Sequence, residues 1–122
     1  MARKSLVATF CGASLLLAGC GDKPLSYQAD IKPILDNNCA SCHTTSGEGY
    51  AKSGLLLDSY EGMMKGTKFG PIVTPGSSVS STLYRLVSGK ADPSLRMPHD
   101  KDPLSKENVD LIGKWIDQGA KN

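Results

Sequence analysis

The residues Cys39-Ala40-Ser41-Cys42-His43 decide how this sequence is interpreted. Two cysteines separated by two residues, with a histidine directly after the second, form the attachment signature of c-type haem. In such a motif Cys39 and Cys42 would each bond to a vinyl group of the porphyrin, and His43 would present an imidazole nitrogen to the iron. The motif therefore predicts one covalently bound haem c with His43 as its proximal ligand.

Three other uses of a CxxC pair have to be weighed against haem attachment. A zinc site needs four ligands, but the sequence has no second CxxC pair and His99 is its only other histidine. A thioredoxin-like dithiol would be expected within a βαβ pattern, which the downstream sequence lacks. A disulfide between Cys39 and Cys42 would close so short a loop that it would stabilise the chain little.

The first twenty residues have the pattern of an export signal. Arg3 and Lys4 form a short basic region, and the apolar run from Leu6 to Ala18 is too short to span a bilayer. The run ends in Leu17-Ala18-Gly19-Cys20, which resembles the lipobox of bacterial lipoproteins. The resemblance implies cleavage before Cys20 and lipidation of its sulfur, and hence an exported protein anchored to a bacterial membrane on its periplasmic side or at the cell surface. The alternative is an ordinary signal peptide.

The four cysteines are then all accounted for. Cys11 leaves with the signal peptide, Cys20 carries lipid, and Cys39 and Cys42 carry haem, so no thiol remains for another disulfide or for a nucleophile. Loss of Arg3 and Lys4 from the 14 basic residues leaves as many basic as acidic residues, of which there are 12. A neutral chain does not favour nucleic acid as a partner.

The remaining chain is expected to form a short tether and one small all-α domain. The predicted boundaries are a signal peptide over residues 1–19, a lipidated tether over 20–25 and a single domain over 26–122. Apolar periodicity and capping residues predict about four helices with long ordered loops between them. The helices are expected to begin after Ser26 with Pro33 in the first turn or at a kink, after Asp58 or Ser59, near Val79, and after Ser105. The loops are expected over residues 44–54, 67–76 and 91–103.

The second axial position of the iron decides what such a domain can do. If a side chain fills it, electron exchange is favoured, whereas an open position allows ligand binding or peroxide chemistry. Met63 and Met64 lie in a predicted helix and are expected to pack in the core. Met97 lies in a loop rich in proline and precedes Pro98, which restricts its backbone, so we predict Met97 as the sixth ligand. His99 is the alternative and would give a bis-histidine iron.

Several stretches together resemble the small class I cytochromes c, and in particular the planctomycete-type cytochrome c domain. They cover nearly the whole chain after the tether and read DIKPIL (30–35), CASCH (39–43), LLLDSYEGMMKG (55–66), GPIVTPG (70–76), SSTLYRLVSG (80–89), RMP (96–98) and PLSKENVDLIGKWIDQGA (103–120). The resemblance implies a small cytochrome c fold around one covalent haem, with an N-terminal helix crossing a C-terminal helix. It also implies Cys39 and Cys42 as attachment sites and His43 and Met97 as axial ligands.

The activity that the resemblance implies is electron transfer between redox partner proteins, not enzymatic catalysis. The sequence contains no constellation of acid, base or nucleophile that would act on a small-molecule substrate. Two alternatives remain open at this point: a peroxidase-like redox subunit and a gas-binding haem sensor. Both require an open sixth position on the iron.

Overall fold

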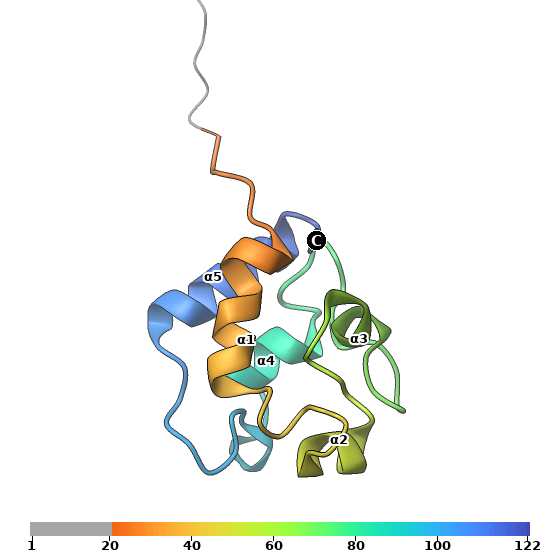
Figure 1. The fold of residues 1–122 in the computed structure, drawn as a ribbon. Helices are drawn as coiled ribbons and strands as arrows, with labels where there is room; N and C mark the ends of the chain where they lie inside the picture. The colour runs from red at the N-terminus through yellow and green to blue at the C-terminus, as the bar shows by residue number, and fades with distance from the viewer. Residues whose placement is uncertain (1–20) are drawn as a thin grey trace, which may run out of the picture.

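Five α-helices form the domain in a computed structural model that describes residues 21–122 (Figure 1). The predicted signal peptide and Cys20 lie outside these described residues. Within 21–122 the only β-type pairing is an isolated bridge between Thr67 and Gly70, so the all-α class is confirmed. None of the described helices has the length and apolarity needed to cross a membrane. The helices are Lys32–Asn38 (α1), Glu48–Ser53 (α2), Tyr60–Lys65 (α3), Thr82–Val87 (α4) and Lys106–Asp117 (α5), with a π-helical turn Tyr27–Ile31 (η1) and a 3₁₀ turn Pro93–Leu95 (η2).

The N-terminal helix follows its predicted capping signals. Ser26 has extended backbone angles and its hydroxyl accepts a hydrogen bond from the amide of Ala29, so one free donor of the first turn is satisfied. Pro33 is the second residue of α1 and has no N–H to donate, and the wider π-helical turn η1 lies directly before α1. The chain therefore passes from η1 into α1 at the proline and continues to Asn38, directly before the CASCH motif.

Aromatic side chains join the N-terminal and C-terminal segments of the domain. Tyr27 on η1 is fully buried, with its ring centroid 5.5 Å from that of Tyr60 and 6.3 Å from that of Trp115 on α5. The Trp115 indole N–H donates to the carbonyl of Lys121 at 2.8 Å, and the Tyr60 hydroxyl donates to the carbonyl of Ala120 at 2.9 Å. The N-terminal and C-terminal helices thus pack on each other through aromatic rings that also fix the last residues of the chain.

A glycine allows α4 to pack closely on α5. A Cβ atom placed on Gly113 would lie 2.7 Å from Cε2 of Tyr84, which is closer than carbon atoms approach in proteins. Gly113 is buried, and its backbone angles are ordinary for a helix, so glycine is needed here for space. The small residue at this position brings the Tyr84 ring against the helix backbone.

Two parts of the helix prediction were wrong. Residues 44–54 were expected to form a loop, but they contain α2, which raises the number of helices from about four to five. The helix expected near Val79 begins only at Thr82, and Val79 is 70% exposed. The reason lies in Ser81, whose hydroxyl accepts from the amide of Thr74 and donates to the carbonyl of Ser77, so this segment is stabilised as a turn.

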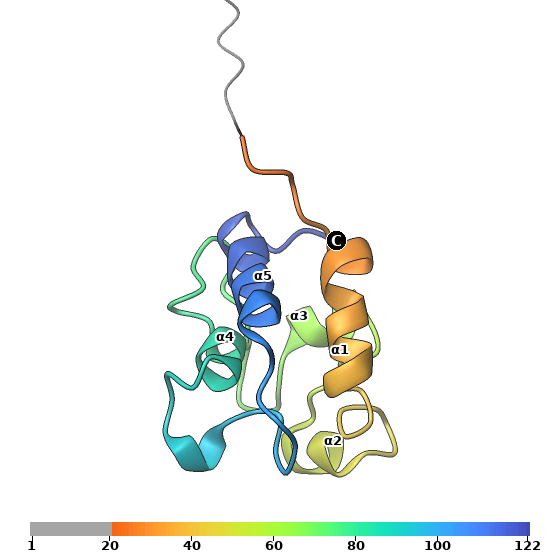
Figure 2. The same ribbon diagram turned by 90° about the vertical axis from the view of Figure 1, so that its left-hand side faces the viewer.

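The two termini of the described chain lie at one end of the domain, and the CASCH motif lies toward the other. Figures 1 and 2 show the start of the described chain and the C-terminus together at one end, beside η1 and the end of α5. In both views α2 and the loop that contains η2 lie at the opposite end. The CASCH motif follows α1 directly, so it lies toward the α2 end.

Candidate cofactor-binding site

A cavity of about 870 Å³ lies beside the CASCH motif. Its volume is in the range of about 300–1,000 Å³ that is usual for cofactor and ligand pockets. Its walls come from the motif, α2, the loop before residue 72, α4 and the segment 97–101. The apolar part of the wall includes Leu55, Leu57, Ile72, Leu83, Leu86 and Val87.

The predicted site residues come together in this cavity. Cys39, Cys42, His43 and Met97 all line it, and so does the alternative ligand His99. Cys39 is half-buried and Cys42 is exposed, and both are free thiols. The remaining predicted site residue, Cys20, lies outside the described residues.

His43 is oriented by a backbone carbonyl. Its ring nitrogen Nδ1 lies 3.3 Å from the carbonyl oxygen of Leu55, and its own carbonyl accepts a hydrogen bond from the amide of Leu57 at 2.8 Å. A proton on Nδ1 that is donated to Leu55 leaves Nε2 with a free lone pair, the arrangement that metal-binding histidines use. Burial lowers the pKa of His43, and the hydrogen bond with Leu55 opposes this shift only in part. The imidazole is therefore neutral at neutral pH, as a metal ligand has to be.

Two glycines fit α2 against the motif, and the sequence analysis did not identify them. A Cβ on Gly47 would lie 2.2 Å from the carbonyl oxygen of Cys42, and a Cβ on Gly49 would lie 2.8 Å from Cε1 and 2.9 Å from Nε2 of His43. The amide of Tyr50 donates to the same Cys42 carbonyl at 3.0 Å. Neither glycine has a positive φ, so both are needed for space. The sequence does contain a Gly-x-Gly pattern shortly after the motif. Only the position of α2 shows that these two glycines lie against Cys42 and His43.

The state of Cys39 argues against a redox-active dithiol. Burial raises the pKa of Cys39 to about 11, although the charge of Lys101 acts in the opposite direction. A thiol with so high a pKa is protonated at neutral pH, unlike the activated cysteine of a redox motif. In addition, residues 21–122 contain no group of three or more His, Cys, Asp or Glu side chains arranged to hold a metal ion.

Met97 and His99 differ in how they are held. The amide of Met97 donates to the carbonyl of Leu86 on α4 at 3.3 Å, and its half-buried side chain packs against the core. His99 is exposed. Met63 is fully buried in the core and is not part of the cavity wall, as expected for a packing methionine.

The rim of the cavity carries lysines and an exposed aromatic ring. Lys52 and Lys101 contribute to the lining, and Lys101 donates to the hydroxyl of Ser41 within the motif at 3.0 Å. Phe69 is 83% exposed, and the ammonium nitrogen of Lys68 lies over its ring, 5.2 Å from the centroid of the Phe69 ring. The cavity thus has an apolar interior and a lining that carries charges of both signs, since Glu48 and Asp100 also line it and Glu48 pairs with Lys52.

The sequence of a known family fits this geometry. The family described as planctomycete cytochrome C matches residues 39–101, just over half of the chain. The chain belongs to this family. The matched region begins at the first cysteine of the motif and includes Met97. The family implies a c-type cytochrome domain, and covalent haem c as its cofactor.

A curated relative and the solved structures add little beyond the family. The chain is similar to hydrazine synthase subunit alpha of Kuenenia stuttgartiensis, with 25% identity over 126 residues that cover 81% of this chain. The chain spans only 16% of the length of that protein. No solved structure matches the chain.

The residues present fit a covalently attached haem. The cavity brings together the thiols of Cys39 and Cys42, which a c-type haem uses for covalent attachment, and the imidazole of His43 and the thioether of Met97, which suit its axial positions; His99 lines the cavity as well. Leucine, isoleucine and valine side chains supply the apolar contact that a porphyrin needs, and the cavity has the volume of a cofactor pocket. Gly49 of α2 leaves room for the His43 ring at one side of this cavity.

Proposed function

We propose that the chain is a monohaem electron carrier in which Cys39 and Cys42 hold the haem and His43 and Met97 are the axial ligands. The observation that supports this proposal most directly is that these four side chains line one cavity with apolar walls. When bound there, haem supplies an iron that gains or loses a single electron. The protein needs no acid, base or nucleophile for this activity.

The side chains around the cavity have separate tasks in this proposal. His43 keeps its Nε2 lone pair available because Nδ1 is engaged with Leu55. The apolar side chains of Leu57 and Leu83 exclude water from the interior, so little solvent has to reorganise when charge changes there. The exposed rim with Lys52 and Lys101 is the side from which a redox partner protein approaches.

Met97 is favoured over His99 as the sixth ligand by the way it is held. Its backbone is hydrogen-bonded to α4 and its side chain packs on the core, whereas His99 is exposed. A thioether ligand raises the reduction potential relative to a second histidine, and it fills the position at which a substrate would otherwise bind.

We also propose that the chain is exported and anchored to a membrane by lipid on Cys20. The pattern of residues 1–20 supports this, and attachment of c-type haem outside the cytoplasm agrees with it. Replacement of Cys20 by Ser is expected to release the protein from membranes, and retention of that variant on membranes would contradict the anchor.

A second candidate is an enzyme subunit or a gas sensor whose iron has an open sixth position. The similarity to a protein named hydrazine synthase subunit alpha favours this alternative, although the chain spans only 16% of that protein. The two candidates differ in one property, which is whether a side chain occupies the sixth position.

Absorption spectra of the purified protein distinguish the candidates. A carrier is expected to have low-spin ferric haem with the weak methionine-sulfur charge-transfer band, and to bind carbon monoxide slowly when reduced. Met97→Ala should abolish that band, whereas Met64→Ala, which removes a methionine outside the cavity wall, should leave it unchanged. A Met97→Ala spectrum identical to the wild type would rule out Met97 as the ligand. High-spin iron in the wild type would favour the enzyme or the sensor.

A further inference from the structure

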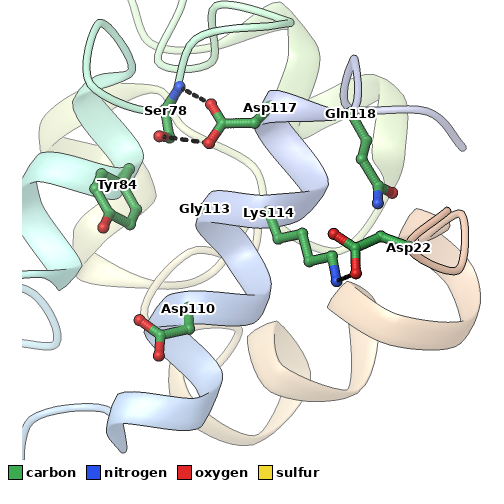
Figure 3. Close-up of a pocket in the computed structure, with 8 residues that line it drawn as sticks. All are labelled: Asp22, Ser78, Tyr84, Asp110, Gly113, Lys114, Asp117 and Gln118. Atoms are coloured by element: carbon green, nitrogen blue, oxygen red, sulfur yellow. Dashed lines mark hydrogen bonds and ion pairs between the residues drawn. The ribbon is translucent and has the colours of Figure 1, made fainter. Parts of the chain in front are cut away.

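Residues 22–25, which the sequence predicts to be part of a tether, are held against α5. The ammonium group of Lys114 lies 2.7 Å from a carboxylate oxygen of Asp22 (Figure 3). Gln118 binds the same segment twice, because its amide oxygen accepts from the amide of Leu25 at 2.8 Å and its amide nitrogen donates to the carbonyl of Lys23 at 3.2 Å. Leu25 itself is half-buried and packs against the core. The chain is thus hydrogen-bonded to the end of α5 from Lys23 to Leu25, and Asp22 adds an ion pair at the surface.

The groove in Figure 3 is explained by these contacts. It has a volume of about 530 Å³ and lies between α4, α5 and the segment around Asp22. Its polar groups bind one another: Asp117 accepts from the amide and the hydroxyl of Ser78, and Lys114 pairs with Asp22 (Figure 3). The groove therefore receives the tether, and its side chains have no need of another ligand.

The fixed tether limits how the domain can move relative to its point of attachment. A flexible tether of six residues would have a mean reach of roughly 13 Å, about the radius of gyration of a domain of 100 residues, so the domain could roll over freely. With the Lys23 carbonyl held by Gln118, only Gly21 and Asp22 separate the held segment from Cys20, and two extended residues span about 7 Å.

We propose that Lys114 and Gln118 set the orientation of the domain, so that the cavity opening faces away from the membrane and toward a water-soluble redox protein. This inference rests on the proposed lipid at Cys20. Residue 21 lies at one end of the molecule, and α2 and the η2 loop lie at the other (Figures 1 and 2). A lipid next to Gly21 therefore holds the C-terminal end of α5 near the bilayer and the rim residues Lys52 and Lys101 far from it.

The orientation is tested with the lipidated, haem-loaded protein on phosphatidylcholine vesicles that contain a lipid with a fluorescent headgroup. Haem near the bilayer quenches this fluorescence by energy transfer. The double variant Lys114→Ala/Gln118→Ala is expected to increase the quenching about twofold or more, because a free domain with a radius of gyration of about 13 Å brings its cavity closer to the lipid. Lys32→Ala/Asp36→Ala is the matched control, since these two side chains of α1 pair with each other at 2.6 Å and neither lines the groove that receives the tether.

The outcomes separate the orientation from the lipid anchor. Wild-type protein that binds vesicles and quenches as strongly as the double variant would overturn the orientation alone. Failure of every form to bind vesicles would overturn the lipid on Cys20 and the orientation with it. The docking of the tether is measured independently by hydrogen exchange of the Leu25 amide in the haem-loaded protein. Gln118→Ala should accelerate this exchange about fivefold, which corresponds to one hydrogen bond, and an unchanged rate would overturn the docking.

Discussion

Substitution of Gly49 by Ala tests whether α2 sets the position of the proposed axial histidine. The added Cβ would lie 2.8 Å from Cε1 of His43 and 2.9 Å from the carbonyl oxygen of Cys42. Carbon atoms in ordinary contact are about 3.5–4.0 Å apart, so the imidazole ring has to move by roughly 0.7 Å or more. The Cys42 carbonyl is held by the amide of Tyr50, so the side chain of His43 yields before the backbone does.

The expected cost follows from two opposing effects. Overpacking of this size destabilises a protein by about 1–3 kcal/mol, whereas Ala stabilises a helix relative to Gly by at most about 1 kcal/mol. The net loss is therefore about 1 kcal/mol, which corresponds to roughly 4–8 °C in the melting temperature of a domain of this size. Displacement of the ring also strains its bond to iron, so part of the ferric haem should become high-spin.

The measurement compares thermal unfolding and ferric absorption spectra of the haem-loaded Gly49→Ala protein with those of the wild type. Gly21→Ala is the control, since a Cβ at Gly21 meets no atom within 4 Å. If Gly49→Ala melts at or above the wild-type temperature and keeps an unchanged low-spin spectrum, the contact between α2 and His43 does not position the ligand.

Three further predictions concern the aromatic core and the helix contact at Gly113. Burial, together with the charges of Asp36, Asp58 and Glu61, raises the pKa of Tyr27 to about 12. The unfolded tyrosine ionises near pH 10 while the folded one stays protonated, so the unfolding free energy should fall as the pH rises from 10 to 12. Denaturant titrations of the wild type measure this fall. An unfolding free energy that stays constant over this range would contradict the raised pKa. Tyr27→Phe should raise the unfolding free energy at neutral pH by about 1 kcal/mol and weaken this alkaline loss, since the buried hydroxyl has no hydrogen-bond partner among the described residues; a clear destabilisation would point to a partner for the hydroxyl. Gly113→Ala should lower the unfolding free energy by about 1–3 kcal/mol because the new methyl group meets the Tyr84 ring, and Tyr84→Ala should relieve part of that loss in a double-mutant cycle; strictly additive effects would refute the contact.

The capping residues made much of the fold predictable from the sequence. Ser26, Ser59 and Ser105 each accept a hydrogen bond from the third residue after them, at the helix starts where their spacing predicts it. Ile112, Trp115 and Ile116 of α5 recur at helical spacing, and all three are fully buried. Helix caps and buried helix faces depend on residues close together in the sequence, so a few neighbouring residues are enough to predict them.

The parts that were missed depend on contacts that no local pattern contains. The segment 44–54 is rich in Ser, Thr and Gly, which are poor helix formers, and α2 forms where the Tyr50 amide meets the carbonyl of Cys42. The hydrogen-bond partner of His43 is the backbone carbonyl of Leu55. Every residue has such a carbonyl, so the residue type at position 55 does not indicate the contact. In the same way, residues 22–25 have the composition of a free linker, and their contacts with Lys114 and Gln118 lie about 90 residues away in the sequence.

Covalent attachment of haem through Cys39 and Cys42 underlies the proposed electron transfer, and a haem stain of the purified protein on a denaturing gel measures it. The stain is expected to migrate with the polypeptide and to survive prior extraction with acidic acetone, and Cys39→Ser/Cys42→Ser is expected to abolish it. A colourless protein, or pigment that acidic acetone removes from the wild-type chain, would show that no haem is attached through these cysteines.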